Sequence, residues 1–268
     1  MDDYFYEARF DNDISEWRAI TRRSLLHTAW QRYGRPSRAS RTRMLDVGCG
    51  TGVTMLSFED VGPVWGIDIS PLAVEFCRKR GLANVLQASA EDLPLEDRSF
   101  DLITMADVLE HIVDDQAAMN ELHRVCAPGG LLVVVVPAFR FLWSNRDERL
   151  QHKRRYTASE LRSKAEKAGF TICKCTYIDT FLFPPLLTLV RLGLITGAKP
   201  AVRMDVAPRL PLVDQLWLAV SRLEHALLRW LDFPFGVSVL CVAEKITNSQ
   251  AGENRVEQYV SVSYLARL

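Results

Sequence analysis

Asp46-Val47-Gly48-Cys49-Gly50-Thr51-Gly52 is the stretch of sequence that decides the fold class of this chain. It follows a short apolar run, residues 44–47, that is typical of a β-strand, and it opens a short helical segment. Glycines at alternate positions let the backbone turn tightly and approach a ligand closely. A loop that ends at a helix N-terminus also points N–H groups at a bound anionic group. The stretch therefore predicts a strand, a ligand-binding turn and a helix.

Asp68 stands further along, at the end of the next predicted strand, residues 64–69. An acidic residue there can accept hydrogen bonds from both ribose hydroxyls of a nucleoside. A dinucleotide site would have the pattern G-x-G-x-x-G. In this chain the third glycine comes one residue early, and Asp46 precedes the first glycine by two. The pattern favours a nucleoside ligand other than a nicotinamide cofactor.

At these residues the sequence resembles the class I S-adenosylmethionine (SAM)-dependent methyltransferases, whose first motif has the form D-x-G-x-G-x-G. The resemblance covers about residues 40–140. It is closest to the type-11 group, which acts mostly on small molecules and includes quinone-biosynthesis enzymes. Beyond the glycine loop it is carried, in order, by residues 66–70, 84–94, 99–103, 107–111 and 128–131.

The resemblance implies SAM as cofactor and S-adenosylhomocysteine as product. Asp46 would help to hold the methionine ammonium, Asp68 the ribose and Ile69 the adenine. Many relatives carry an aspartate where this chain has Ser89, whose hydroxyl is an uncharged acceptor. The residues implied to bind the cofactor are Asp46, Gly48, Cys49, Gly50, Gly52, Asp68, Ile69, Ser89, Ala90 and Asp107.

Strands and helices alternate along the rest of the chain. Residues 131–136 are an unbroken apolar run, typical of a strand buried on both faces of a parallel sheet. Thr157 and Glu160 form a capping box that predicts a helix over residues 157–168, and further strands are expected at 171–177 and 237–244. The fold class predicted is α/β, a Rossmann-like, seven-stranded, mostly parallel doubly wound sheet. Its last strand is antiparallel, and a helical insertion separates the last two strands.

We expect three regions in the chain. Residues 1–41 form an N-terminal helical lid segment, residues 42–245 a methyltransferase domain, and residues 246–268 a C-terminal tail. The apolar insertion, residues 180–235, has helical spacing over its second half. It fits a cap over an apolar acceptor pocket, a surface that contacts a membrane, or a homodimer interface.

His111, His152 and Tyr156 are the candidate catalytic residues. They follow the fourth and fifth predicted strands, and α/β sheets bind ligands beyond the carboxyl ends of their strands. The alternatives are a structural histidine in the turn at 109–111 and a solvated loop at 151–156. No cluster of His, Cys and Asp has metal-ligand spacing, so no metal site is expected.

The composition of the chain limits the classes of binding partner that we expect. Lys and Arg total 33, as do Asp and Glu, so the chain lacks the basic excess usual in nucleic-acid binders. No signal peptide and no apolar stretch of about 18–20 residues is seen, so we expect a cytoplasmic protein, with peripheral membrane contact as the alternative raised by the insertion. The cysteines are expected to be reduced. Cys173 and Cys175, two apart in a predicted strand, should point to one face.

The predicted function is methyl transfer from SAM to a small, apolar or lipid-like acceptor, on oxygen, carbon or nitrogen. Because the methyl group of SAM is already activated, the protein mainly has to align the acceptor, which can contribute up to roughly 7–11 kcal/mol. The alternative is a non-catalytic SAM-binding or scaffolding subunit.

Overall fold

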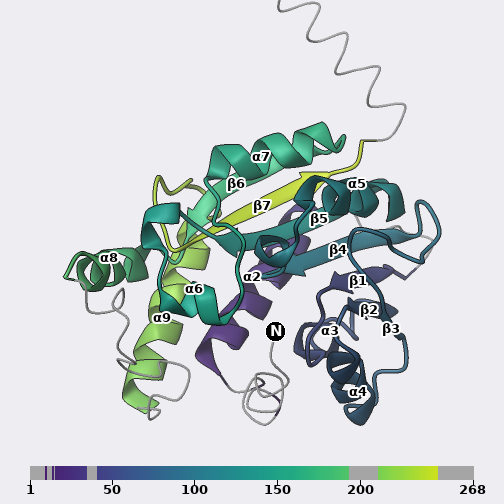
Figure 1. Cartoon of the computed structure of the whole chain (residues 1–268), viewed down its shortest axis with the longest axis horizontal. Helices are drawn as coiled ribbons and strands as arrows, with labels where there is room; N and C mark the ends of the chain where they lie inside the picture. The colour runs from purple at the N-terminus through teal and green to yellow at the C-terminus, as the bar shows by residue number, and fades with distance from the viewer. Residues whose placement is uncertain (1–9, 11–13, 15, 35–40, 193–210, 247–268) are drawn as a thin grey trace, which may run out of the picture.

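The computed structural model describes residues 10, 14, 16–34, 41–192 and 211–246. Within them, seven strands form one sheet in the order β3-β2-β1-β4-β5-β7-β6 (Figure 1). β7 is antiparallel to β5 and β6, and the other neighbours are parallel, which confirms the predicted fold class. The strands are β1 (Met44–Val47), β2 (Val64–Asp68), β3 (Val85–Gln87), β4 (Phe100–Ala106), β5 (Cys126–Pro137), β6 (Thr171–Ile178) and β7 (Ser238–Glu244).

Helices cover both faces of the sheet. α5 and α7 pack on one face, and α2 and α4 pack on the other. Because both faces are covered, residues 131–136 of β5 are all buried, as their unbroken apolar run predicts. The helices are α2 (Trp17–Tyr33), α3 (Val53–Leu56), α4 (Pro71–Lys79), α5 (Asp115–Val125), α6 (Asn145–Arg149), α7 (Ala158–Lys167), α8 (Phe183–Arg191) and α9 (Pro211–Leu227).

The capping box at the start of α7 is confirmed. The Glu160 carboxylate accepts the Thr157 backbone N–H at 2.7 Å, and the Thr157 hydroxyl accepts the Glu160 N–H at 3.3 Å. Two backbone donors that the helix leaves without a carbonyl partner are thereby satisfied. This end of α7 directly follows the loop that carries His152.

Cys173 and Cys175 do not share a face, so that prediction is wrong. Cys175 packs with the core beneath α5 and α7, whereas Cys173 packs with the core beneath α2 and α4. The cause is a register shift of β6 against β7 between Ile172 and Lys174. Such a bulge adds a residue to one strand and breaks the two-residue alternation of side chains.

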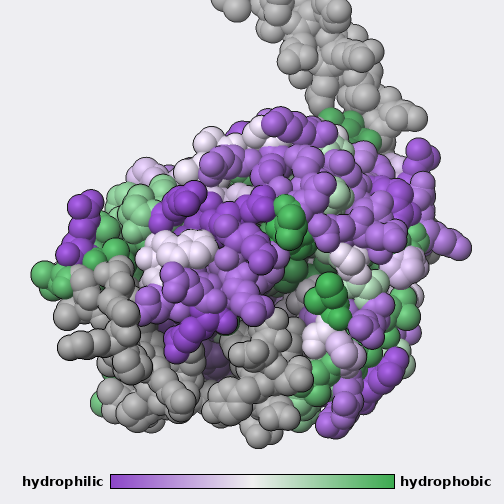
Figure 2. Space-filling view, viewed as in Figure 1, coloured by the Kyte–Doolittle hydropathy of each residue, from purple (hydrophilic) through white to green (hydrophobic). Residues whose placement is uncertain are grey.

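The insertion between β6 and β7 contains α8 and α9, as predicted. α9 packs along α2, and the rings of Trp17 and Trp217 stack with centroids 6.1 Å apart. Apolar side chains gather where α8 lies, at the left of Figure 2. No helix in the described part of the chain is long and apolar enough to cross a membrane. The predicted tail, apart from Ile246, and most of residues 1–15 lie outside the described residues.

Candidate active site

The glycine loop follows β1 and is shaped by three left-handed glycines. Gly48 has φ of +74°, and a Cβ there would collide with the side chain of Val108, so this position requires glycine. Gly50 has φ of +55°, and no atom of the described residues lies within 4 Å of where its Cβ would be. Gly52, also left-handed, precedes α3, which spans only four residues. The loop thus leaves an open space beside Gly50, as a cradle for a ligand requires.

Asp68 anchors this loop from the end of β2. Its carboxylate accepts the N–H of Gly50 at 2.9 Å and the N–H of Ser70 at 2.9 Å. The neighbouring N–H of Cys49 donates to the Ile67 carbonyl at 3.0 Å. These two bonds hold the carboxylate at the edge of the loop, where the sequence predicts that Asp68 accepts from the ribose hydroxyls.

Asp46 lies beneath the loop and is 3% exposed. Its carboxylate accepts the hydroxyl of Thr104 at 2.6 Å. Burial raises the pKa of Asp46 to about 7, the hydrogen bond from Thr104 opposes this rise, and the charge of Asp68 adds to it. A buried carboxyl that ionises near neutral pH is suited to receive a cationic group of a ligand.

The remaining predicted cofactor residues lie at the ends of β2, β3 and β4. Ile69 is 71% exposed, so its apolar side chain is available to a flat ring. Ser89 accepts the N–H of Glu91 at 3.2 Å, and Ala90 is buried. Asp107 pairs with Arg22 of α2, Nη2 to Oδ2 3.2 Å. No motif singled out this arginine, because it lies far from the glycine loop along the chain.

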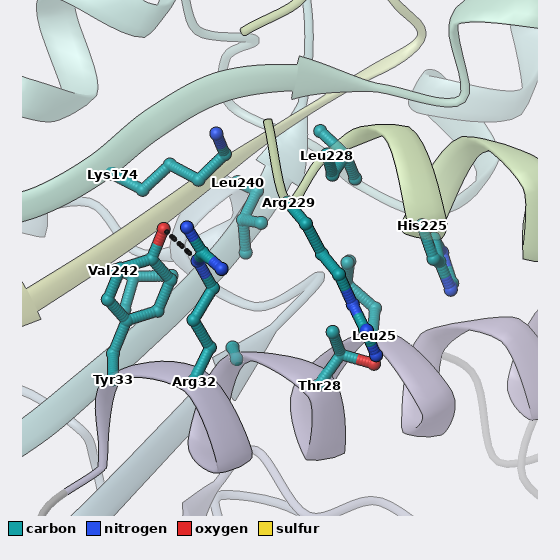
Figure 3. Close-up of a pocket in the computed structure, with 11 residues that line it drawn as sticks. Leu25, Thr28, Arg32, Tyr33, Lys174, His225, Leu228, Arg229, Leu240 and Val242 are labelled. Atoms are coloured by element: carbon teal, nitrogen blue, oxygen red, sulfur yellow. Dashed lines mark hydrogen bonds between the residues drawn. The ribbon is translucent and has the colours of Figure 1, made fainter. Parts of the chain in front are cut away.

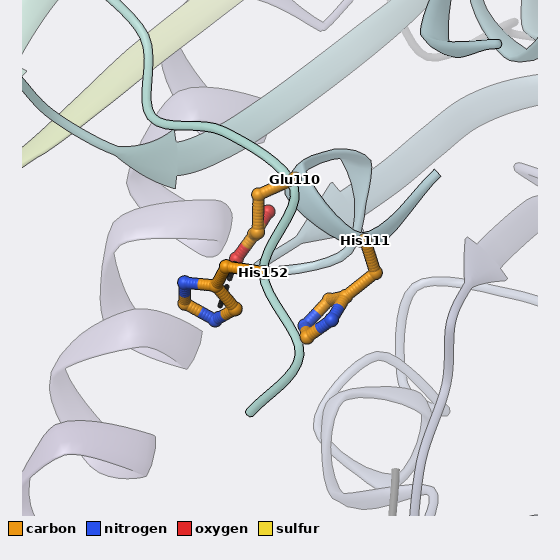
Figure 4. Close-up of side chains that lie close together, drawn as sticks. All are labelled: Glu110, His111 and His152. Carbon is orange, nitrogen blue, oxygen red and sulfur yellow. Dashed lines mark ion pairs between the residues drawn. The ribbon is translucent and has the colours of Figure 1, made fainter. Parts of the chain in front are cut away.

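A second group of side chains meets beyond β4 and β5. Glu110 and His111 lie in the short 3-10 turn Leu109–His111, and His152 lies in the loop after α6 (Figure 4). The His111 and His152 rings meet edge to face with centroids 4.7 Å apart, and His152 Nε2 is 3.9 Å from Glu110 Oε1. The Lys153 N–H donates to the Glu110 carbonyl at 2.8 Å, so the two segments are tied together.

These groups are largely removed from water. Burial raises the pKa of the Glu110 carboxyl well above its usual value. Burial and the neighbouring His152 lower the pKa of His111 to about 4, so that its imidazole is neutral at neutral pH. The turn therefore presents a neutral imidazole beside a buried carboxyl group.

Asp147 holds His152 from behind. Its carboxylate lies 2.9 Å from His152 Nδ1 and accepts two hydrogen bonds from Arg155, at 2.7 and 2.9 Å. The N–H of Ser144 adds a further bond at 2.8 Å. Burial works to raise the pKa of Asp147, but the hydrogen bonds from His152 and Arg155 outweigh it and lower that pKa. The sequence analysis did not predict this role of Asp147.

Tyr156, predicted as a catalytic candidate, has a different environment. It is 2% exposed, and its hydroxyl donates to Asp115 at 2.8 Å. Burial and this carboxylate raise the pKa of the phenol far above its usual value. Since its hydroxyl is engaged inside the core, we remove Tyr156 from the proposed catalytic residues.

Spacing along the chain predicted no metal site, but the fold brings together three side chains that could hold an ion. Ligand atoms of Glu110, His111 and His152 all lie within 4.8 Å of one another. His152 is remote from the other two along the chain, and spacing alone gives no such cluster. The carboxyl ends of the neighbouring parallel strands β4 and β5 bring the segments together. The sequence did contain one indication of this cluster, because both segments follow neighbouring strands.

A pocket between α2, α9 and strands β6 and β7 is separate from this site (Figure 3). Leu25, Tyr33, Leu228 and Val242 are among its walls, and its free interior of about 20 Å³ has room for a water-sized molecule. None of the described residues that line it belongs to the glycine loop or to the turn at 109–111. It is therefore too small and too remote to be the cofactor site.

Comparison with known proteins agrees with the fold and the loop. Residues 45–134 match the family model described as a methyltransferase domain. The ubiquinone/menaquinone biosynthesis C-methyltransferase UbiE of Shewanella halifaxensis is 35% identical over 123 residues, which cover 41% of this chain and 49% of that protein. The chain thus spans about half the length of the curated relatives it matches.

Solved structures extend the likeness to the whole fold. Phosphoethanolamine N-methyltransferase 2 of Haemonchus contortus, solved with SAM, superposes with a TM-score of 0.56 at 18% identity, over 83% of this chain and 52% of that one. The [4+2]-cyclase SpnF superposes with a TM-score of 0.54 at 22% identity, over 84% of this chain and 81% of that one. These likenesses concern the fold alone, which supports more than one reaction.

In its sheet, its glycine loop and the matching segment 45–134, the chain is similar to class I methyltransferase domains. Its family model is that of the type-11 group, which confirms the resemblance found in the sequence. SAM is the cofactor of this class. The open space beside Gly50, the position of the Asp68 carboxylate at the loop and the exposed Ile69 fit that cofactor.

Proposed function

We propose that this protein transfers the methyl group of SAM to a small-molecule acceptor. The observation that carries the proposal is the glycine loop, whose space beside Gly50 is bordered by an anchored carboxylate, Asp68. When bound, SAM supplies a methyl group on a cationic sulfur. The chain's own task is to bind the cofactor, orient the acceptor and exclude water.

Each part of the loop has a role in this proposal. Gly48 and Gly50 let the backbone approach the amino-acid part of the cofactor, and Asp46 attracts its ammonium group. Asp68 accepts from the ribose, and Ile69 covers one face of the adenine. Ser89 and Ala90 border the adenine edge. His111 and His152 lie near the acceptor, since Val108, three residues before His111, packs against Gly48.

The acceptor class is inferred from a cluster of rings beyond β5 and β6. Phe139 stacks on Tyr177 with centroids 4.6 Å apart and on Phe141 with centroids 4.9 Å apart. Phe183, at the start of α8, meets Phe139 and Phe235 at 5.9 and 5.2 Å. Such a surface suits an apolar or lipid-linked acceptor, with the insertion acting as its cap. The name of the relative UbiE, a quinone-biosynthesis enzyme, points to the same chemistry.

Isothermal titration of the full chain with S-adenosylhomocysteine and with NADH tests the cofactor role. We expect binding of S-adenosylhomocysteine alone, weakened at least tenfold by Asp68→Ala and unchanged by Asp232→Ala. Asp232 is an aspartate remote from the loop that pairs with Lys174. A screen of phenols, quinones and prenyl lipids with labelled SAM then tests transfer. Cofactor binding without transfer to any acceptor would favour a scaffolding subunit.

A further inference from the structure

We propose that Glu110, His111 and His152 form a binding site for a divalent transition-metal ion of the zinc type. Two imidazole nitrogens and one carboxylate oxygen are ligands that such ions accept readily. The ligand atoms lie within 4.8 Å of one another, so small side-chain movements would bring them onto a common ion. Three protein ligands also leave coordination positions open to a small molecule.

Glu110 supports the metal site in a way that is independent of the cluster geometry. The residue is 1% exposed, and its Oε2 is buried with no hydrogen-bond partner in the described part of the chain. A buried acceptor without a donor costs about 1–3 kcal/mol, and more for a charged group. A cation between Glu110 and the two histidines would remove that cost.

His152 is held as a metal ligand usually is. One ring nitrogen, Nδ1, meets the Asp147 carboxylate at 2.9 Å, while Nε2 is directed towards Glu110. Metal-binding histidines commonly use one nitrogen for a carboxylate in this way, which fixes the tautomer and the ring orientation. Asp147 is itself fixed by Arg155 and Ser144. We therefore assign Asp147 as a positioning residue for the site.

The position of the metal site in the fold indicates which ligand would occupy the open coordination positions of the ion. This inference rests on the proposed function. Val108 precedes Glu110 and His111 and packs against Gly48, so an ion held by these residues would lie on the side of the glycine loop that is proposed to bind SAM. A bound cation lowers the pKa of a coordinated hydroxyl. The hydroxyl proton would pass to water, and the oxygen would form a bond to the methyl carbon. The C–S bond would break with its electron pair left on sulfur. The acceptors would then be phenolic or enolic hydroxyls, methylated on oxygen.

The test is titration of the chelator-treated full chain with Co²⁺, a coloured substitute for Zn²⁺. We expect one equivalent of Co²⁺ to give visible absorption bands, displaced by Zn²⁺. Glu110→Gln, His111→Ala and His152→Ala should each weaken binding at least tenfold. Asp147→Asn should weaken it about 10–100-fold. His225→Gln, at a half-buried histidine of α9 outside the cluster, should bind as the wild type does.

Circular dichroism and S-adenosylhomocysteine titration of the same preparations separate the outcomes. Folded wild-type protein that shows no Co²⁺ bands, or bands that survive all three ligand substitutions, overturns the metal site. If such protein still binds S-adenosylhomocysteine, the proposed function stands without the metal. Metal binding without S-adenosylhomocysteine binding supports the site and counts against the proposed function. Catechol should perturb the Co²⁺ bands, and an unchanged spectrum would overturn the acceptor-oxygen step.

Discussion

The guanidinium of Arg22, on helix α2, pairs with the carboxylate of Asp107 at the carboxyl end of β4, Nη2 to Oδ2 3.2 Å. Asp107 has φ of +56°, a left-handed conformation that aspartate adopts more readily than most residues. Its N–H donates to the Val135 carbonyl at 2.8 Å. Asp107 directly precedes Val108, which packs against the glycine loop. The pair therefore connects α2 with Val108, which lies between the glycine loop and the proposed metal site.

A double-mutant cycle of Arg22→Met and Asp107→Asn should show a modest coupling. The Asp107 side chain is 50% exposed, and such pairs contribute about 0.2–1 kcal/mol. Asparagine also tolerates the left-handed backbone. Urea unfolding followed by tryptophan fluorescence measures the coupling energy. A value of zero would mean that this pair does not help to hold α2 against the end of β4.

Gly50→Asn should abolish cofactor binding while leaving the fold intact. Asparagine tolerates positive φ, and its side chain would project into the open space beside the loop. We expect the affinity for S-adenosylhomocysteine to fall at least tenfold, measured by isothermal titration.

Gly81→Asn is the matched control for this substitution. Gly81 also has positive φ, +84°, and in the described part of the chain nothing lies within 4 Å of its Cβ position, but it follows α4 outside the glycine loop. This variant should bind S-adenosylhomocysteine as the wild type does. Equal binding by both variants would mean that the cofactor does not occupy the space beside Gly50.

Features that depend on neighbouring residues could be predicted from the sequence. The alternate glycines fixed the turn after β1, and the Thr157–Glu160 spacing fixed the start of α7, because both are satisfied within a few residues. The strand order agreed with the family resemblance. Two-residue alternation failed at Cys173 because a bulge against β7 depends on the partner strand, which lies beyond the insertion.

The meeting of Glu110 with His152 could not be read from spacing. The two residues are joined by the packing of β4 against β5, and their chemistry depends on burial that only the folded chain provides. Tyr156 gives the opposite case. It lies close to His152 along the chain, yet its hydroxyl turns into the core to Asp115. Proximity in sequence therefore grouped Tyr156 with His152, although the fold separates its hydroxyl from that histidine and brings Glu110 beside it.

Glu224 on α9 should be important for docking the insertion. It is 3% exposed, and its carboxylate accepts the N–H groups of Asp179 and Thr180, where β6 gives way to the insertion. Glu224→Ala would leave two backbone donors without their acceptor, at about 1–3 kcal/mol each. Urea unfolding should show this loss, whereas Asp214→Ala on the same helix should change stability by no more than about 0.5 kcal/mol. Equal stability of both variants would contradict the anchoring role.

Asp46 should make stability depend on pH. Its pKa is about 7 in the folded chain, above its unfolded value, so the folded state keeps the proton that the unfolded state loses. The contribution of this carboxyl to stability is therefore greatest at low pH and falls as pH rises from about 4 to about 7. Asp46→Asn retains an acceptor for Thr104 but does not titrate. Its stability relative to wild type should rise over that range, by an upper limit of roughly 4 kcal/mol. If the urea midpoints of wild type and Asp46→Asn changed in parallel from pH 5 to pH 8, this prediction would be contradicted.

The ionisation of Asp46 also predicts that cofactor binding depends on pH. An ammonium group near Asp46 favours the ionised carboxylate, so binding near pH 6 must first remove its proton. The affinity of wild-type protein for S-adenosylhomocysteine should therefore rise between pH 6 and pH 8, with net proton release detectable by calorimetry in buffers of different ionisation enthalpy. Asp46→Asn should bind more weakly at pH 8 and show a flatter dependence. If both proteins gave the same pH profile, Asp46 would not hold the ammonium, and its carboxyl would serve only to position the loop through Thr104.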